Sequence, residues 1–171
     1  MNPGDNLIVR SENTEDRSVI RSINEAAFVG SDEADLVERL RAEGVVLVSL
    51  VAEVKSRIVG HILFSRMWVE TTKGSVSAVA LAPMAVLPEY QRRGIGGRLI
   101  RDGLDALRSL AEQIVIVVGH PDYYPRFGFS SERTRSLESP FPPEPFMALE
   151  LSPGALDGIR GRVRYAASFG L

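Results

Sequence analysis

A glycine-rich turn is the segment of this 171-residue chain whose residue types best suit ligand binding. Glycines stand at positions 94, 96 and 97 of the run Gln91-Arg92-Arg93-Gly94-Ile95-Gly96-Gly97-Arg98. Glycine has no Cβ, so a ligand can approach the main chain closely, and the first turn of a helix has N–H groups without partners in the helix. Those groups and the helix dipole favour a phosphate or diphosphate. The alternative is that the glycines serve only the packing of a strand-to-helix connection.

The spacing in this turn excludes two common phosphate-binding motifs. No Gly-Lys-Ser/Thr follows, as a Walker loop requires, and Gly94-Ile95-Gly96-Gly97 lacks the dinucleotide-binding spacing. The chain has no cysteine and only two histidines, which leaves few ligands for a dedicated transition-metal site. Neither histidine accompanies a nucleophile elbow, so no Ser-His-Asp triad is expected. Phosphate binding and packing therefore both remain open for this turn, and no dedicated metal site is expected.

Two adjacent tyrosines follow a short apolar run and could act as acids. A phenol has a reference pKa near ~10, so it is protonated at neutral pH. Tyr124 and Tyr123 are both candidates, because neighbouring residues on an extended segment face opposite ways. The alternative role of Tyr124 is packing with a satisfied hydroxyl. Phe127 and Phe129 are expected to anchor the core.

The elements that must position these segments are a mixture of strands and helices. A Thr14 N-cap is expected for the first helix, Ser31 or Asp32 for the second, and Pro83 predicts an irregular strand or a bulge. A short helix or strand is expected within 153–165. This pattern predicts one layered α/β domain spanning residues 1–171. The predicted strands are 7–10, 45–54, 57–69, 76–86, 114–118 and 146–151, and the predicted helices are 15–28, 32–44 and 94–110.

Composition and charge exclude several partners. The formal net charge of −2 gives no strong attraction to nucleic acid or to an anionic membrane. No segment approaches the ~20 apolar residues of a membrane span, and residues 1–10 lack the pattern of a secretory signal. We expect a cytoplasmic protein, a monomer or homodimer, with neither nucleic-acid nor membrane partners.

Two motifs together resemble the GNAT (GCN-five-related N-acetyltransferase) superfamily. The run Gln91-x-x-Gly94-x-Gly96, after a strand ending at Val86, resembles its acetyl-CoA signature, and Tyr124-x-x-x-Gly128-Phe129 resembles its Tyr-x-x-x-Gly-Phe segment. The wider run 119–129 and the tail 155–165 are similar to a bacterial subfamily of predicted N-acetyltransferases of uncertain substrate. The resemblance spans most of the chain and is weakest before Val45.

This resemblance implies a fold, an activity and a set of site residues. The fold is a mostly antiparallel sheet with a splayed parallel strand pair, flanked by helices, and the activity is direct transfer of an acetyl group from acetyl-CoA to a primary amine. Tyr124 donates to the thioester sulfur, and Gln91 shapes the loop. The pantetheine arm pairs with main chain of Met84, Ala85 and Val86, and the diphosphate lies on amides of Arg92, Arg93, Gly94, Ile95, Gly96 and Gly97.

The base that takes the amine proton is not fixed by the sequence. Residues 77–86, where the family often has a carboxylate, contain no Asp, Glu or His. His61, Glu150 and Glu25 are the candidates, and we prefer a water-mediated route. An amide near Met84 or Ala85 could donate to the oxyanion.

The acceptor is equally open and could be a small molecule or a protein. We expect it against the first two helices, the loop after residue 28 and the proline-rich stretch 139–145. The acidic start of the second helix, residues 32–35, could attract a cationic amine or simply cap the helix. Alternative functions are a CoA-binding sensor without catalysis, an O-acyltransferase and a transferase of longer acyl chains.

Overall fold

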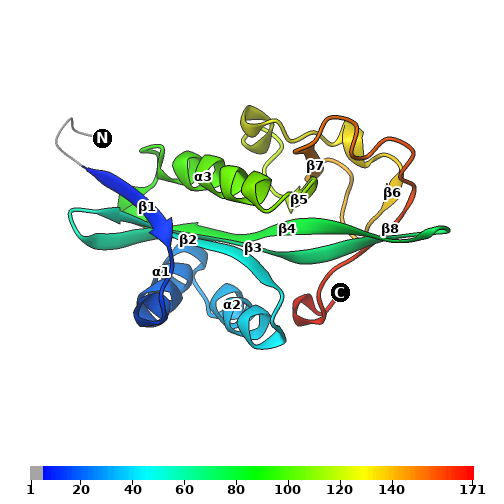
Figure 1. Ribbon diagram of the computed structural model, residues 1–171. Coiled ribbons are helices and arrows are strands. Elements are labelled where there is room, and N and C mark those ends of the chain that lie inside the picture. Colours follow the sequence, from blue (N-terminus) through cyan, green and yellow to red (C-terminus); the bar gives the residue numbers. More distant parts are fainter. Residues whose placement is uncertain (1–5) are drawn as a thin grey trace.

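One mixed sheet runs through the whole molecule (Figure 1). The computed structural model describes residues 6–171, so half of the stretch 1–10 considered for a secretory signal lies outside the described residues. The strand order is β1-β2-β3-β4-β5-β7, with β8 also beside β3 and β6 beside β8. All pairs are antiparallel except β4–β5 and β6–β8, which confirms the predicted fold class. The strands are β1 Leu7–Ser11, β2 Val46–Val54, β3 Arg57–Thr71, β4 Gly74–Val86, β5 Ile114–Val118, β6 Leu137–Glu138, β7 Phe146–Glu150 and β8 Gly161–Arg164.

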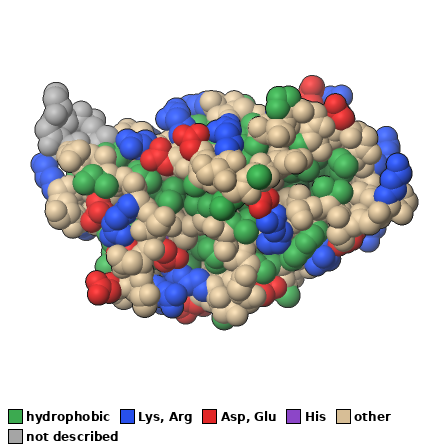
Figure 2. All heavy atoms as spheres, in the orientation of Figure 1, with side chains coloured by type: hydrophobic (Ala, Val, Ile, Leu, Met, Phe, Trp, Pro, Cys, Tyr) green, Lys and Arg blue, Asp and Glu red, His purple; other side chains and the backbone are tan. Residues whose placement is uncertain are grey.

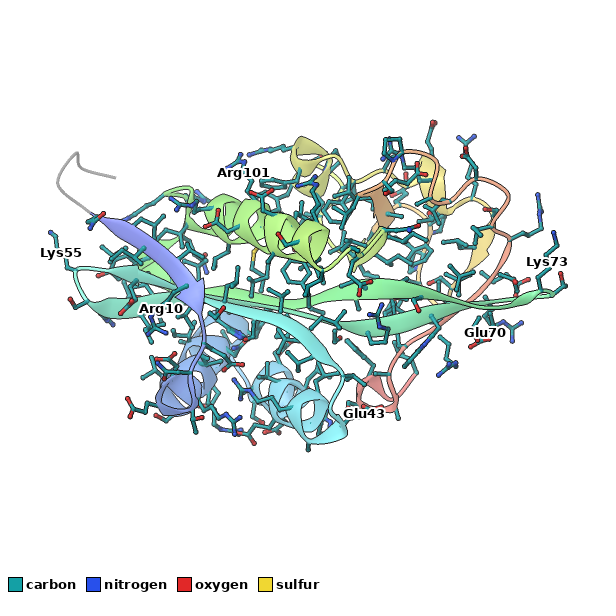
Figure 3. The ribbon with its side chains drawn as sticks, in the orientation of Figure 1. Arg10, Glu43, Lys55, Glu70, Lys73 and Arg101 are labelled. Atoms are coloured by element: carbon teal, nitrogen blue, oxygen red, sulfur yellow. The ribbon has the colours of Figure 1, made fainter. Side chains whose placement is uncertain are left out.

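Helices cover both faces of this sheet. The helices α1 Arg17–Phe28 and α2 Asp32–Glu43 lie on one face, and α3 Ile95–Ser109 lies on the other (Figure 1). Arg101 on α3 and Glu43 on α2 accordingly lie on opposite sides of the sheet in Figure 3. Short 3-10 helices are found at Thr14–Asp16, Pro88–Tyr90, Tyr124–Phe127, Glu132–Thr134 and Ala167–Phe169.

The alternation of side chains along β2 explains this layering. Leu50 and Ala52 point to the core beneath α3, whereas Val51 between them packs with Ile20 and Leu40 of the other helical layer. The sheet is therefore buried on both faces, and β5 is an almost continuous apolar run, as the sequence predicts.

Several boundaries differ from those predicted. Asn13, and not Thr14, caps the start of the first helical segment: Asn13 Oδ1 accepts from the Glu15 amide at 3.0 Å, and the Asn13 amide donates to Asp16 at 2.7 Å. A 3-10 turn therefore precedes α1, which begins at Arg17. Within the stretch 153–165, for which a short helix or strand is expected, β8 forms a short strand. It pairs with β3 and β6, which lie far from it in the sequence, and local sequence patterns do not predict such pairing.

Charged side chains of both signs are interspersed over the face of the molecule shown in Figure 2. Most arginines of the described chain pair with acids, as Arg21 does with Glu25, Asp35 and Glu38. Arg92, Arg101 and Arg126 are among the arginines for which the described residues supply no acidic partner.

Candidate functional site

The parallel strands β4 and β5 separate where the site begins. They pair only at Val79–Val115 and Ala80–Ile116, and β4 continues to Val86 paired with β3 but no longer with β5. In the pairing of β4 with β3, Leu81 lies opposite Phe64 and Met84 lies opposite Ile62. The stretch of β4 between these two pairs is therefore one residue longer than that of β3. This bulge contains Pro83, as predicted. The main chain of β4 beyond Ala80 therefore turns an unpaired edge towards β5.

A cavity of about 1050 Å³ occupies this gap. It is lined by Leu81, Ala82, Pro83 and Met84 of β4 and by Val118 and Gly119 at the end of β5. Its walls come from both helical layers, since the start of α3 and the adjoining ends of α1 and α2 all contribute. The cavity thus reaches both faces of the sheet. Its size is that of a site for a cofactor-sized ligand.

The glycine-rich turn forms one wall of this cavity. Gly94 is the N-cap of α3 with φ +81°, and the first bond of the helix runs from the Arg98 amide to the Gly94 carbonyl at 3.0 Å. Within residues 6–171 the amides of residues 92–97 have no hydrogen-bond acceptor. A Cβ on Gly96 would meet the Tyr123 hydroxyl at 2.9 Å. The turn therefore presents free N–H groups to the cavity, and the absence of a side chain at Gly96 leaves room for an anion to approach them.

Gln91 lies at the base of this turn. Its Nε2 donates to the Val86 carbonyl at 3.0 Å, which ties the turn to the end of β4. Arg92, with φ +61°, adopts a left-handed conformation unusual for a residue with a Cβ. These contacts support the expectation that Gln91 shapes the loop.

Arginines without acidic partners surround the α3 end of the cavity. Arg92, Arg101 and Arg126 line it and form no ion pair within the described chain. The guanidinium of Arg101 lies 5.1 Å from the Phe127 ring centre and that of Arg126 lies 5.7 Å from that of Tyr123. Arg98, by contrast, is paired with Asp102 at 3.0 Å and does not line the cavity. This end of the cavity is therefore positively charged.

Tyr124 and Tyr123 both line the cavity, in different surroundings. Tyr124 begins a 3-10 turn, so the segment is not extended as expected, and the two rings meet edge to face with centres 5.2 Å apart. Tyr124 is 8 % exposed, and burial raises its pKa to about 12. Its hydroxyl has no partner within residues 6–171, and it is not among the fully buried unpaired oxygens. The tyrosine hydroxyl therefore stays protonated and accessible from the cavity.

Gly119 fixes the Tyr124 ring in place. A Cβ at this glycine would lie 2.3 Å from the ring, so only glycine allows the ring to pack against the end of β5. The His120 carbonyl accepts from the amides of both tyrosines, at 3.1 and 3.3 Å, and thereby holds the loop. Phe129 is buried in the core as expected, and Phe127 packs against the same core while also lining the cavity.

The three side chains considered as bases all lie outside the cavity lining. His61 is 0 % exposed, with Nε2 2.9 Å from Ser49 Oγ and Nδ1 3.4 Å from Asn24 Nδ2, and burial lowers its pKa to about 3. Glu25 pairs with Arg21, and Glu150 accepts from the Leu156 amide at 2.9 Å. The ionisable groups other than arginine and tyrosine that do line the cavity are Glu33 and His120.

Other sequence predictions are met in part. Met84 and Val86 line the cavity, but Ala85 is buried and pairs with His61 in the sheet. Of the segments expected to contact the acceptor, the first two helices contribute Ala27, Phe28, Glu33 and Leu36 to the cavity lining. Ser139 and Pro140 of the proline-rich stretch instead line a separate hollow of about 560 Å³ beside β8.

Two arginines that line the positively charged end of the cavity were not identified from the sequence. Arg101 lies outside both motifs, and Arg126 occupies one of the variable positions between Tyr124 and Gly128. The helical spacing from Gly97 to Arg101 is a signal that could have found the first, because a Cβ on Gly97 would lie 3.3 Å from the Arg101 guanidinium.

Two absences hold for the described part of the chain. Residues 6–171 contain no group of three His, Asp or Glu side chains placed to hold a metal ion. No helix among them has the length and apolar character needed to cross a bilayer.

A splayed parallel pair, a glycine turn opening a helix and a tyrosine at the gap together define an acyl-CoA-dependent acyltransferase fold. The acetyltransferase (GNAT) domain model matches residues 46–131. The chain belongs to this family, which confirms the resemblance found in the sequence.

Relatives cover the rest of the chain. The uncharacterized N-acetyltransferase YhbS of Escherichia coli K12 is 30 % identical over 95 % of this chain and 98 % of its own length. The uncharacterized N-acetyltransferase YjhQ of the same strain is 47 % identical over 67 % of this chain, and this match spans 64 % of that relative.

Solved structures agree with the fold. The crystal structure of E. coli YhbS in complex with CoA has a TM-score of 0.90 and 29 % identity over 100 % of this chain and 96 % of that one. A GNAT acetyltransferase from Brucella melitensis, in complex with acetyl-CoA, has a TM-score of 0.81 and 34 % identity over 96 % and 98 %.

Proposed function

We propose that this protein is an N-acetyltransferase that moves the acetyl group of acetyl-CoA directly to a primary amine. One observation carries the proposal: the unpaired edge of β4, the free amides of the α3 turn and the Tyr124 hydroxyl all face one cavity. Each of the three suits a different part of a long thioester. The family and the CoA-bound relatives support the same assignment.

The residues present fit acetyl-CoA on chemical grounds. The pantetheine arm is an amide chain, which can pair with the free edge of β4 at residues 81–86 as an added strand would. The diphosphate is an anion, for which the amides of residues 92–97 and the unpaired Arg92 are suitable donors. Arg101 and Arg126 supply further positive charge beyond the turn. When bound, acetyl-CoA supplies a thioester, whose carbonyl carbon accepts a nucleophile.

The chain's own groups then have defined tasks. The acceptor ammonium loses one proton to water, and its neutral nitrogen attacks the carbonyl carbon, so a C–N bond forms and the C–S bond breaks. Tyr124, kept protonated by burial, donates its hydroxyl proton to the departing sulfur. The attacking nitrogen releases its second proton to water, from which Tyr124 is reprotonated. The products are an amide and CoA with a free thiol.

Binding and turnover can be tested separately. Acetyl-CoA at millimolar concentration should raise Tm, because a ligand of the folded state stabilises it. Turnover with a panel of primary amines should release CoA, which a thiol reagent detects; the chain has no cysteine, so the protein adds no background. An unchanged Tm at millimolar acetyl-CoA would refute the proposal. A raised Tm without CoA release across the panel would favour the sensor function instead.

We further propose that residues 1–171 act as one domain in the cytoplasm. The absence of cysteine is compatible with a reducing compartment, and a single sheet connects the described elements. Light scattering in solution would decide between the proposed monomer and homodimer.

A further inference from the structure

The cavity has two ends of opposite chemical character. At the α3 face of the sheet it is lined by arginines and free amides, as described above. At the α1–α2 face it is lined by Ala27, Phe28, Glu33 and Leu36. Among all its described lining residues, Glu33 is the carboxylate. If phosphates occupy the positive end, the other end remains for the acceptor.

Glu33 differs from the acids around it. Arg21 forms ion pairs with three neighbours, at 2.9 Å to Glu25, 2.8 Å to Asp35 and 2.9 Å to Glu38. Glu33 is partly buried and has no ion pair or hydrogen bond to any residue of 6–171. Its charge is therefore uncompensated and is directed to the cavity that it lines. A cationic ligand would compensate it.

The surface around Glu33 is apolar and partly exposed. Phe28 is 41 % exposed although it lines the cavity, and Leu36 is partly buried beside it. Val29, the next residue, is 92 % exposed and has φ +55°, an outlier for a β-branched side chain. An apolar ligand body would cover this surface, whereas a hydroxylated one would lose hydrogen bonds to water there.

We propose that Glu33 binds the ammonium group of the acceptor, and that the acceptor is a primary amine carried on an apolar chain or ring. This proposal rests on the proposed N-acetyltransferase function. An α-amino acid is disfavoured, because its carboxylate would lie beside Glu33 and repel it. An aminosugar is disfavoured, because its hydroxyls would face Phe28 and Leu36.

The test compares primary amines that differ in the group that carries the amine: apolar, carboxylate-bearing or hydroxylated. With saturating acetyl-CoA, kcat/KM is measured for hexylamine, phenylethylamine, alanine and glucosamine. The two apolar amines should exceed the other two by at least about tenfold, the ratio expected when polar groups are left unpaired in an apolar site. Equal or higher values for alanine or glucosamine would overturn the proposal.

The role of Glu33 is tested by Glu33→Gln with a matched control. Losing one hydrogen bond between charged groups should raise KM for the apolar amines about 10- to 100-fold, while the rise in Tm caused by acetyl-CoA stays as in the wild type. The control Asp32→Asn removes one negative charge from the same helical turn, but Asp32 is exposed and does not line the cavity. This variant should change neither KM for the apolar amines nor the rise in Tm caused by acetyl-CoA. Unchanged KM in Glu33→Gln would overturn the proposal, although turnover itself would still stand.

A binding measurement covers the case in which no amine is turned over. Calorimetry of hexylamine with the CoA-loaded protein should show binding that Glu33→Gln weakens. Absence of binding in the wild type would refute the acceptor class. If acetyl-CoA itself fails to raise Tm, the proposed function fails before the acceptor is in question.

Discussion

Gly96→Ala separates ligand binding from folding at the α3 turn. A methyl group at this position would lie 2.9 Å from the Tyr123 hydroxyl and 3.4 Å from the Met84 terminal methyl. Both neighbours are ends of side chains and can move by the few tenths of an ångström required. The methyl group nevertheless occupies the surface over which a diphosphate must approach the Gly96 amide to within about 3 Å.

The expected magnitudes have opposite signs. Alanine in place of glycine stabilises a helix by up to about 1 kcal/mol, so the Tm of the free protein should stay constant or rise by about 2–4 °C for a chain of this size. Loss of one or two hydrogen bonds to a charged group, at about 1.5–3 kcal/mol each, should weaken acetyl-CoA binding at least about tenfold. Calorimetric titration with acetyl-CoA and a thermal melt measure the two quantities.

Gly103→Ala is the matched control on the same helix. Its Cβ would meet the buried Phe64 ring at 2.2 and 2.6 Å, away from the cavity. Overpacking costs about 1–3 kcal/mol against the helix gain of about 1 kcal/mol, so Tm should fall by up to about 8 °C with acetyl-CoA affinity retained. Wild-type affinity in Gly96→Ala would refute the placement of the diphosphate over this turn.

Two further predictions concern the tyrosine and the buried histidine. Tyr124→Phe keeps the ring that packs on Gly119, so the rise in Tm caused by acetyl-CoA should persist while kcat falls about 10²-fold or more; full activity would exclude Tyr124 as the acid. Burial lowers the pKa of His61 from 6.5 to about 3, so below pH 6.5 the unfolded chain gains a proton that the folded chain does not. The free energy of unfolding should therefore fall as pH drops from about 6.5 towards 3, by about 2 kcal/mol at pH 5, and urea titrations at pH 7 and 5 should show a smaller difference in His61→Gln.

Local chemistry explains which features were predictable. The apolar run of β5, the glycine turn and the Pro83 irregularity are each determined by a few neighbouring residues, and all three are found as predicted. The two motifs also predicted the family, because they specify the fold around them. What the sequence could not supply is the pairing of distant segments, such as β8 beside β3.

The acceptor end of the cavity shows the same limit. Nothing in the spacing of residues 32–35 distinguishes Glu33 from Asp35, since both suit the start of a helix. Only the packing of α1 against α2 brings Arg21 to Asp35 and leaves Glu33 at the cavity. His61, similarly, has the ordinary appearance of a base until its burial beneath α1 is known.

Because one cavity reaches both faces of the sheet, the proposed mechanism predicts sequential kinetics, in which both substrates bind before the reaction. In the proposed binding mode the nucleotide occupies the α3 face and the amine reaches the thioester from the α1–α2 face, so neither substrate would obstruct the other's entry. Both are held together before any bond changes, and no acetylated enzyme needs to accumulate. Double-reciprocal plots at several fixed amine concentrations should intersect rather than run parallel.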